Sequence, residues 1–152
     1  MSQVADRLKF VQPTPVILLA GAMTQRQLAG KTMAGIARAA FNTGSVVVDS
    51  GVGSQIEKFT MRKGVQLLGV CPEAQICYPK ISNRQDNELT NGHTHFFMIG
   101  NNEIGTEFEW GDESRCKYDL VQRIAKGRIS GMGGSVAPPC KMVTVVIGDN
   151  EQ

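Results

Sequence analysis

Chemistry in this sequence is expected first in a short turn, Asp49 to Glu57, which reads DSGVGSQIE. Two glycines, Gly51 and Gly53, allow backbone conformations and close approaches that a side chain would forbid. Ser54 and Glu57 have capping-box spacing, which predicts a helix that begins at the serine. Backbone N–H groups at a helix start suit a phosphate or a carboxylate. The turn therefore predicts a ligand-binding site made by Asp49, Ser50, Gly51, Val52, Gly53 and Ser54, with a phosphate near Gly51 and Gly53.

The same turn also has a purely structural interpretation. Its G-x-G lacks the third glycine of a dinucleotide-binding fingerprint, because Ile56 occupies that place. Asp49 stands where an acidic residue binds ribose in dinucleotide folds, although an aspartate that caps a turn is commoner. Ligand binding and a tight strand–helix turn both stay open.

A group of acidic residues surrounds Trp110 just before a second predicted helix, in the stretch TEFEWGDE. Such residues favour the positive end of a helix dipole, which is a structural role. They would also suit binding of ribose hydroxyls or general acid–base catalysis, for which Glu107 and Glu113 are the candidates. Trp110 could stack on a nucleobase or cover the core.

The two histidines, His93 and His95, flank Thr94 at strand spacing and are expected to face the same way. The sequence has no other histidine, so a third metal ligand is not evident and no metal site is expected. Cys71 ends a predicted strand, where it could pair with a histidine as a nucleophile. A small buried residue before Pro72 is the preferred interpretation.

Composition places the chain among ordinary globular proteins. The 152 residues are 41% hydrophobic and 20% charged, and the net charge of +2 gives no reason to expect nucleic-acid binding. No apolar run approaches the ~20 residues of a membrane span, so direct membrane insertion is not expected. The four cysteines form no C-x-x-C pair, and no secretory signal is evident, which predicts reduced thiols and a cytoplasmic location.

Strand and helix patterns alternate along the chain. Short apolar runs predict strands, and apolar positions at helical spacing, ended by glycines, predict helices. Strands are expected at 15–20, 45–48, 65–70, 94–99 and 142–147, helices at 24–42, 54–63 and 113–126, and an irregular surface excursion at 73–92. This predicts an α/β fold, a Rossmann-like three-layer sandwich with a mostly parallel sheet of about five or more strands. A polar leader (1–14) precedes a single domain (15–150).

In such a sheet, ligands bind beyond the carboxyl ends of the strands. Residues 21–25, 49–55 and 100–113 all follow strands and are expected at that edge. The predicted ligand-binding set therefore also includes Gly21, Ala22, Met23, Gly100, Trp110, Gly111, Asp112 and Glu113.

Three stretches in order, VQLLGVCPEAQICYP, NGHTHFFMIG and EWGDES, resemble the prokaryotic branch of the LSDAT domain. That branch belongs to the SLOG superfamily, whose relatives include the N-terminal region of melastatin-type TRP channels. More distant relatives are the "lonely guy" phosphoribohydrolases and the DNA-processing protein A fold. The resemblance spans Pro15 to Ile147 and implies a Rossmann-like sheet that binds nucleotide-derived ligands, with ADP-ribose-type signals recognised by some relatives.

Position by position, the resemblance implies ligand-binding loops at 21–23 and at 49–52, which matches a D-G-G-T-like turn. Residues 93–95 match the family's H-T-H, and residues 110–114 match its W-G-D-E-S. Ser50 departs from the pattern by replacing a glycine. The family's last helix and a later G-S-G-R-like phosphate loop have no counterpart, which implies a shortened domain or a fragment.

The leading hypothesis is a binding or sensor domain for a nucleotide-derived ligand, with no required cofactor. A different hypothesis is an N-glycosidic hydrolase of a nucleoside monophosphate that uses Glu113 or Glu107. A third is an assembly domain with a vestigial site. A homo-oligomer, expected to be a homodimer, is predicted because the strand at 142–147 would leave an uncovered sheet edge.

Overall fold

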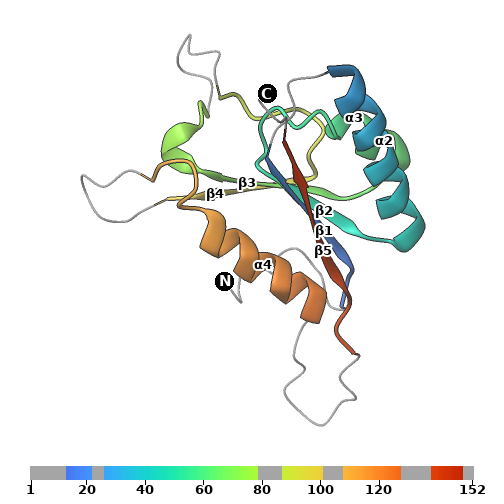
Figure 1. The fold of residues 1–152 in the computed structure, drawn as a ribbon. Coiled ribbons are helices and arrows are strands. Elements are labelled where there is room, and N and C mark those ends of the chain that lie inside the picture. The colour runs from blue at the N-terminus through green and yellow to red at the C-terminus, as the bar shows by residue number, and fades with distance from the viewer. Residues whose placement is uncertain (1–12, 22–25, 79–86, 101–107, 128–137, 149–152) are drawn as a thin grey trace.

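The computed structural model of the protein describes residues 13–21, 26–78, 87–100, 108–127 and 138–148, with only the backbone for 26–29. Five strands form one sheet in these residues (Figure 1): β1 (Val16–Gly21), β2 (Val46–Asp49), β3 (Leu67–Pro72), β4 (His95–Ile99) and β5 (Met142–Ile147). The strand order is β4-β3-β2-β1-β5, and every neighbouring pair is parallel. The predicted α/β, Rossmann-like architecture is confirmed.

Helices cover both faces of the sheet, as Figure 1 shows. The helices α2 (Arg26–Thr43) and α3 (Glu57–Lys63) lie on one face, and α4 (Ser114–Lys126) lies on the other. A 3-10 turn, η1 (Glu73–Gln75), follows β3. This arrangement gives the three layers that the alternation of strands and helices predicts.

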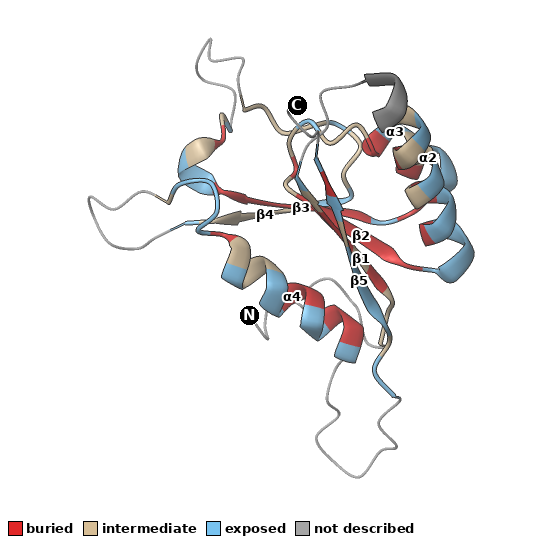
Figure 2. Cartoon of the chain, in the orientation of Figure 1, coloured by how far each residue is buried: buried red, intermediate tan, exposed pale blue. Residues whose placement is uncertain are grey.

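The core is divided into two clusters by the sheet, because neighbouring residues of a strand point to opposite faces. In β1, Leu18 belongs to the cluster under α4, whereas Leu19 belongs to the cluster with Met33 of α2. The central strand β2 is buried along its whole length, as its Val-Val-Val run predicts for a strand covered on both faces (Figure 2).

Two helix details differ from the sequence-based expectation. The helix α3 begins at Glu57 rather than at Ser54. The sequence pattern of the helix expected at 113–126 predicts Tyr118, Val121, Ile124 and Ala125 on its inner face. The buried residues of α4 are Leu120, Val121, Ile124 and Ala125, so the prediction for Tyr118 was wrong. Tyr118 is 43% exposed and lines a cavity instead, because the first turns of α4 lie beside that cavity rather than over the core.

The chain changes direction in the sheet between β1 and β5. It passes outward from β1 through β2 and β3 to β4, and then returns on α4 to place β5 on the other side of β1. Figure 1 shows this return. In open parallel sheets, the crevice at such a switch point is where ligands bind.

The two segments expected to be irregular lie partly outside the described residues. Of the polar leader 1–14, only Pro13 and Thr14 are described, and the Thr14 N–H donates to the Ile124 carbonyl (3.1 Å). Of the excursion 73–92, the described residue Thr90 contacts the turn after β2: its N–H donates to the Gly51 carbonyl (2.9 Å). None of the helices in the described ranges combines the length and apolar character that a bilayer span requires.

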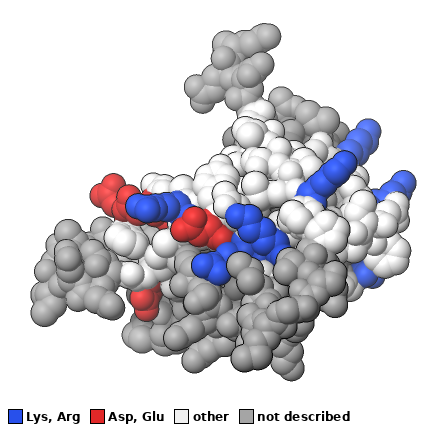
Figure 3. All heavy atoms as spheres, turned by 90° about the horizontal axis from the view of Figure 1, so that it is seen from below, with Lys and Arg blue, Asp and Glu red and all other residues white. Residues whose placement is uncertain are grey.

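The surface observations bear on assembly. The strand β5 lies at a sheet edge, as predicted, and its Val146 is 79% exposed. The homodimer itself stays a prediction. On the face in Figure 3, acidic and basic side chains of the described residues lie next to one another, as the near-balanced composition predicts.

Candidate functional site

A cavity of about 320 Å³ lies at the carboxyl ends of β1, β2 and β5. It therefore lies at the carboxyl edge where a site is predicted, at the switch point of the sheet, and its volume is at the lower end of the range of ligand sites. Its walls come from the strand ends, from the turn after β2 and from the start of α4. The lining residues are Leu18, Leu19, Ala20, Gly21, Met33, Asp49, Ser50, Val52, Gly53, Ser54, Gln55, Glu113, Ser114, Lys117, Tyr118 and Ile147.

The turn after β2 has an alternating backbone. Gly51 (φ 78°), Gly53 (φ 63°) and Gln55 (φ 63°) have positive φ, and the residues between them do not. An alternation of right- and left-handed conformations turns successive N–H groups toward one concavity, which is an arrangement that binds anions.

Some N–H groups of this turn are used by the protein, and others are not. The Gly51 N–H donates to Asp49 Oδ1 (2.8 Å), and the Gly53 N–H donates to Thr90 Oγ1 (2.7 Å). The N–H groups of Val52, Ser54 and Gln55 have no acceptor within the described residues. These three residues line the cavity, so their N–H groups are the candidates for contact with an anionic ligand.

The capping box predicted from Ser54 and Glu57 does not form. The Ser54 hydroxyl donates to Asp49 Oδ2 (2.5 Å) and lies 3.4 Å from Glu57 Oε2, while α3 has no side-chain cap. Because α3 has seven residues and begins at Glu57, its dipole adds little at the turn. The case for an anion site therefore depends on the N–H groups of the turn.

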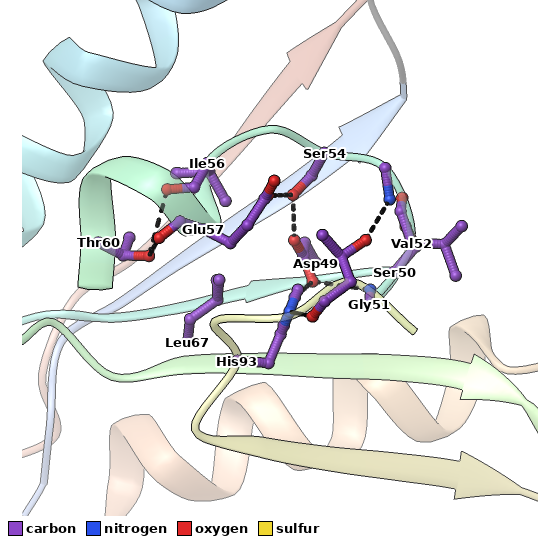
Figure 4. A network of polar contacts seen from close by, with 12 residues as sticks. Asp49, Ser50, Gly51, Val52, Ser54, Ile56, Glu57, Thr60, Leu67 and His93 are labelled. Atoms are coloured by element: carbon purple, nitrogen blue, oxygen red, sulfur yellow. Dashed lines mark hydrogen bonds and ion pairs between the residues drawn. The ribbon is translucent and has the colours of Figure 1, made fainter. Parts of the chain in front are cut away.

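Asp49 holds the turn together (Figure 4). Its side chain is 2% exposed, and both carboxylate oxygens accept hydrogen bonds from the protein. Oδ1 accepts from the Gly51 N–H and from His93 Nε2 (both 2.8 Å), and Oδ2 accepts from Ser54. These contacts are those of a residue that caps a turn, although Asp49 also lines the cavity.

The turn lies closely against β3. A Cβ atom added to Gly69 of β3 would be 2.6 Å from the Gly51 Cα and 2.8 Å from the ring of Phe96. Glycine is required at both positions for this approach, and Gly51 also has a positive φ. Gly51 thus positions the turn from behind and does not line the cavity.

The opposite wall of the cavity carries an ion pair on α4. Glu113 is 5% exposed; its Oε1 accepts from Lys117 Nζ (3.0 Å) and its Oε2 accepts from the Gly111 N–H (2.7 Å). Burial raises the pKa of Glu113, but the hydrogen bonds and the charge of Lys117 outweigh it and hold the pKa below its usual value. Glu113 is therefore ionised at neutral pH and is poorly suited to act as a general acid.

The structure brings only part of the predicted ligand-binding set together. The members that line the cavity are Gly21, Asp49, Ser50, Val52, Gly53, Ser54 and Glu113. The members that do not line it are Gly51, Gly100, Trp110, Gly111 and Asp112. Ala22, Met23 and the candidate Glu107 lie outside the described residues.

The contacts of the non-lining residues are local. Asp112 Oδ2 accepts from the Glu109 N–H (2.8 Å), which closes the turn before α4. A Cβ on Gly100 would be 2.5 Å from the Glu73 carboxylate. Trp110 is 43% exposed on this turn.

Nine lining residues are outside the predicted ligand-binding set: Leu18, Leu19, Ala20, Met33, Gln55, Ser114, Lys117, Tyr118 and Ile147. Lys117 stands four residues after Glu113, a spacing that predicts an ion pair on one helix face. No sequence signal marks Gln55, because its left-handed conformation is set by the turn around it.

The hypothesis of a Cys–His nucleophile is not supported. Cys71 is completely buried, and burial raises its pKa to about 11, so its thiol stays protonated. His93 bonds to Asp49 and Thr90, and it lies before β4 begins at His95, so the strand-spacing assumption was wrong. Within the described residues, no group of three His, Cys, Asp or Glu side chains could hold a metal ion.

The strained conformation of Gln55 leads to a prediction. A non-glycine residue in the left-handed conformation destabilises the folded state by about 1–2 kcal/mol. A glycine lowers stability by about 0.5–1 kcal/mol, because it loses more conformational freedom on folding. Gln55→Gly is therefore expected to raise the free energy of unfolding by about 0.5 kcal/mol in urea titrations. Gln66→Gly, at an exposed residue without positive φ, should instead lower it. Equal losses in both variants would contradict the interpretation.

The fold and the cavity define a Rossmann-like α/β domain with a potential ligand site at the switch point of its sheet. The chain belongs to the prokaryotic LSDAT family, described as SLOG in TRPM, prokaryote, whose family model matches residues 12–152. The resemblance seen in the sequence is thereby confirmed, and membership is compatible with nucleotide-related binding. No curated protein matches the chain significantly.

Proposed function

We propose that this domain binds a nucleotide-derived ligand, ADP-ribose or a related nucleotide, and acts as a sensor. The observation that carries the proposal is the turn after β2. Val52, Ser54 and Gln55 line the cavity with N–H groups that have no acceptor in the described part of the chain. Alternating φ values in this turn suit a phosphate group.

The wall of the cavity at the start of α4 carries groups that suit the ribose and the phosphates of such a ligand. Lys117 supplies a cation, and Glu113, ionised, accepts hydrogen bonds from hydroxyl groups such as those of a ribose. Between these polar walls, Leu18, Met33 and Ile147 provide an apolar surface for a sugar or base. The mixture of a few polar groups with apolar walls is typical of small-molecule sites.

Binding without turnover is favoured over hydrolysis. Cleavage of an N-glycosidic bond is assisted by a group that donates a proton to the leaving base. Glu113, the described candidate, has a lowered pKa and is held by Lys117, so it lacks a proton at neutral pH. Hydrolysis and an assembly domain with a vestigial site become outcomes of the test below.

The test is a thermal-shift screen with ADP-ribose, cyclic ADP-ribose, NAD and AMP, with adenosine as the phosphate-free control. A ligand at a hundred times its dissociation constant stabilises the folded state by about 2.7 kcal/mol, which raises Tm by roughly 5–10 °C. Mass spectrometry of the mixtures then separates an intact ligand from a cleaved one. A shift with an intact phosphate-bearing ligand supports the sensor, a cleaved ligand supports the hydrolase, and no shift overturns both.

Lys117 provides a sharper test of the site. Lys117→Met keeps the length of the side chain and removes its charge, so affinity for the phosphate-bearing ligand is expected to fall about tenfold, as a hydrogen bond to a charged group is worth roughly 1.5–3 kcal/mol. Lys126→Met, at an exposed residue at the other end of α4, is the matched control. Isothermal titration of both variants measures the difference, and equal affinities would remove Lys117 from the site.

A further inference from the structure

Thr90 and His93 hold the anion-binding turn from outside the cavity. Thr90 makes two bonds to it: its N–H donates to the Gly51 carbonyl (2.9 Å), and its hydroxyl accepts from the Gly53 N–H (2.7 Å). His93 bonds through Nε2 to Asp49 Oδ1 (2.8 Å). Neither residue lines the cavity, yet both contact residues of the turn, as Figure 4 shows for His93 and Asp49.

The environment of His93 requires a proton on both ring nitrogens. Its Nδ1 lies 2.8 Å from the Thr90 carbonyl oxygen, and its Nε2 lies 2.8 Å from the Asp49 carboxylate. A carbonyl oxygen and an ionised carboxylate can only accept, so each ring nitrogen must donate. The side chain of His93 has no exposed surface, and its ring packs against Phe96 with centroids 4.8 Å apart.

The charged groups around His93 favour this doubly protonated form. Burial lowers the pKa of His93, but the hydrogen bond and the charge of Asp49 outweigh it, and the pKa lies above its ordinary value. Glu57 of α3 adds to the same effect. A second cavity is lined by His93, and the other titratable groups that line it are Cys77, Tyr78 and Glu88.

Loss of the proton would disturb the turn. Neutral imidazole has one N–H, so one ring nitrogen would present a lone pair to an oxygen atom. The contact with Asp49 or the contact with Thr90 would then weaken. Both residues hold glycine N–H groups of the turn, so its geometry is coupled to the charge of His93.

We infer that Thr90 and His93 are positioning residues for the anion-binding turn, and that protonation of His93 sets how tightly the turn binds an anion. The inference rests on the proposed function for its ligand. The raised pKa fixes the direction: the contribution is fully present below the pKa of a free histidine, about 6.5, and is lost as pH rises through the folded-state pKa.

The first experiment needs no ligand and uses the chain's two histidines as a matched pair. The amide NMR signals of Gly51 and Gly53 are followed from pH 6 to 9 in the wild type, in His93→Gln and in His95→Gln. His95 is exposed, and its ring forms a hydrogen bond with the adjacent Thr94. We expect both signals to follow one titration in the wild type and in His95→Gln, and to stay constant in His93→Gln. Constant signals in the wild type, or an unchanged titration in His93→Gln, would overturn the inference.

The second experiment measures affinity for ADP-ribose, whose bridging phosphates do not titrate in this range, unlike the terminal phosphate of AMP. Affinity is expected to fall about tenfold, or 1.4 kcal/mol, through the titration in the wild type and His95→Gln but not in His93→Gln. Binding that is independent of pH overturns the inference and leaves the proposed function intact. If ADP-ribose and the other nucleotides bind at no pH while the Gly51 and Gly53 signals titrate, the proposed function fails. The coupling between the charge of His93 and the geometry of the turn is then still supported.

A second pair of variants tests the positioning role at Thr90 without a change at His93. If His93→Gln does not fold, the titration of the wild type still tests the protonation of His93. Thr90→Ser retains the hydroxyl that accepts from Gly53, whereas Thr90→Val keeps the shape and removes the acceptor. Thr90→Ser is expected to bind ADP-ribose like the wild type, and Thr90→Val about tenfold more weakly. Equal binding by the two would contradict a positioning role for Thr90.

Discussion

Replacement of Asp49 by alanine is expected to lower the free energy of unfolding by about 3–5 kcal/mol. The change removes three hydrogen-bond acceptor contacts, to Gly51, Ser54 and His93, at a side chain that is 2% exposed. It also leaves the imidazolium of His93 buried without its counter-charge, which is the most costly part of breaking a buried pair. Such a loss is a large fraction of a typical domain's stability of about 5–15 kcal/mol.

Urea titration at pH 7 measures the loss, with Asp119→Ala as the control because Asp119 is an exposed aspartate on α4. The control should change stability by less than about 0.5 kcal/mol. Asp49→Asn keeps one acceptor oxygen but no charge, so its loss in free energy of unfolding should lie between those of Asp49→Ala and Asp119→Ala. It should also lower the pKa of His93. A loss below about 1 kcal/mol in Asp49→Ala would show that the turn does not depend on this carboxylate.

The role of Asp49 also affects how ligand experiments are interpreted. Its oxygens are engaged by the protein, so a variant that fails to bind a nucleotide reports a lost turn geometry rather than a lost ligand contact. Lys117, which has one described partner and lines the cavity, gives a cleaner measure of direct recognition. The two variants together separate the shape of the site from its charge.

The fold could be predicted from local patterns because positions that are buried in the fold require apolar residues, and their spacing in the sequence therefore indicates which faces are covered. The Val46–Val48 run is apolar since β2 is covered on both faces, and all three residues are buried. The spacing of Met33, Ala37 and Ala40 placed one face of α2 against the sheet, where all three are buried. The carboxyl-edge location of the site then followed from the parallel topology.

The contacts that shape the site were beyond local patterns. Asp49 and His93 are 44 residues apart in sequence, and Gly53 and Thr90 are 37 apart, so no spacing rule connects them. The Ser54 prediction failed for the same reason: a capping box is a local preference, and the buried carboxylate of Asp49 offered its hydroxyl a stronger, charge-assisted bond.

Gly21 leads to the second large effect, because a side chain there would collide with a neighbouring strand. The resemblance suggested a ligand-binding glycine, and Gly21 does line the cavity. However, a Cβ at this position would overlap the carbonyl oxygen of Ile147, its partner in β5, and would lie 3.0 Å from the carbonyl carbon. The φ of +88° adds strain for any other residue.

Gly21→Ala is therefore expected to lower the free energy of unfolding by about 2–5 kcal/mol, the sum of overpacking at about 1–3 and left-handed strain at about 1–2. Urea titration measures it. Gly35→Ala is the control: it lies in α2 with open space around it, and should gain about 0.5–1 kcal/mol. Wild-type stability in Gly21→Ala would refute the packing interpretation.

The same substitution distinguishes the two roles of Gly21. Relief of the overlap requires β5 to move away from β1, and Ile147 of β5 lines the cavity. Affinity for a nucleotide should then fall together with stability, although the added methyl group faces the backbone of β5. A variant that keeps its stability but loses binding would instead assign Gly21 to direct contact with the ligand, since only then could binding be lost without movement of β5.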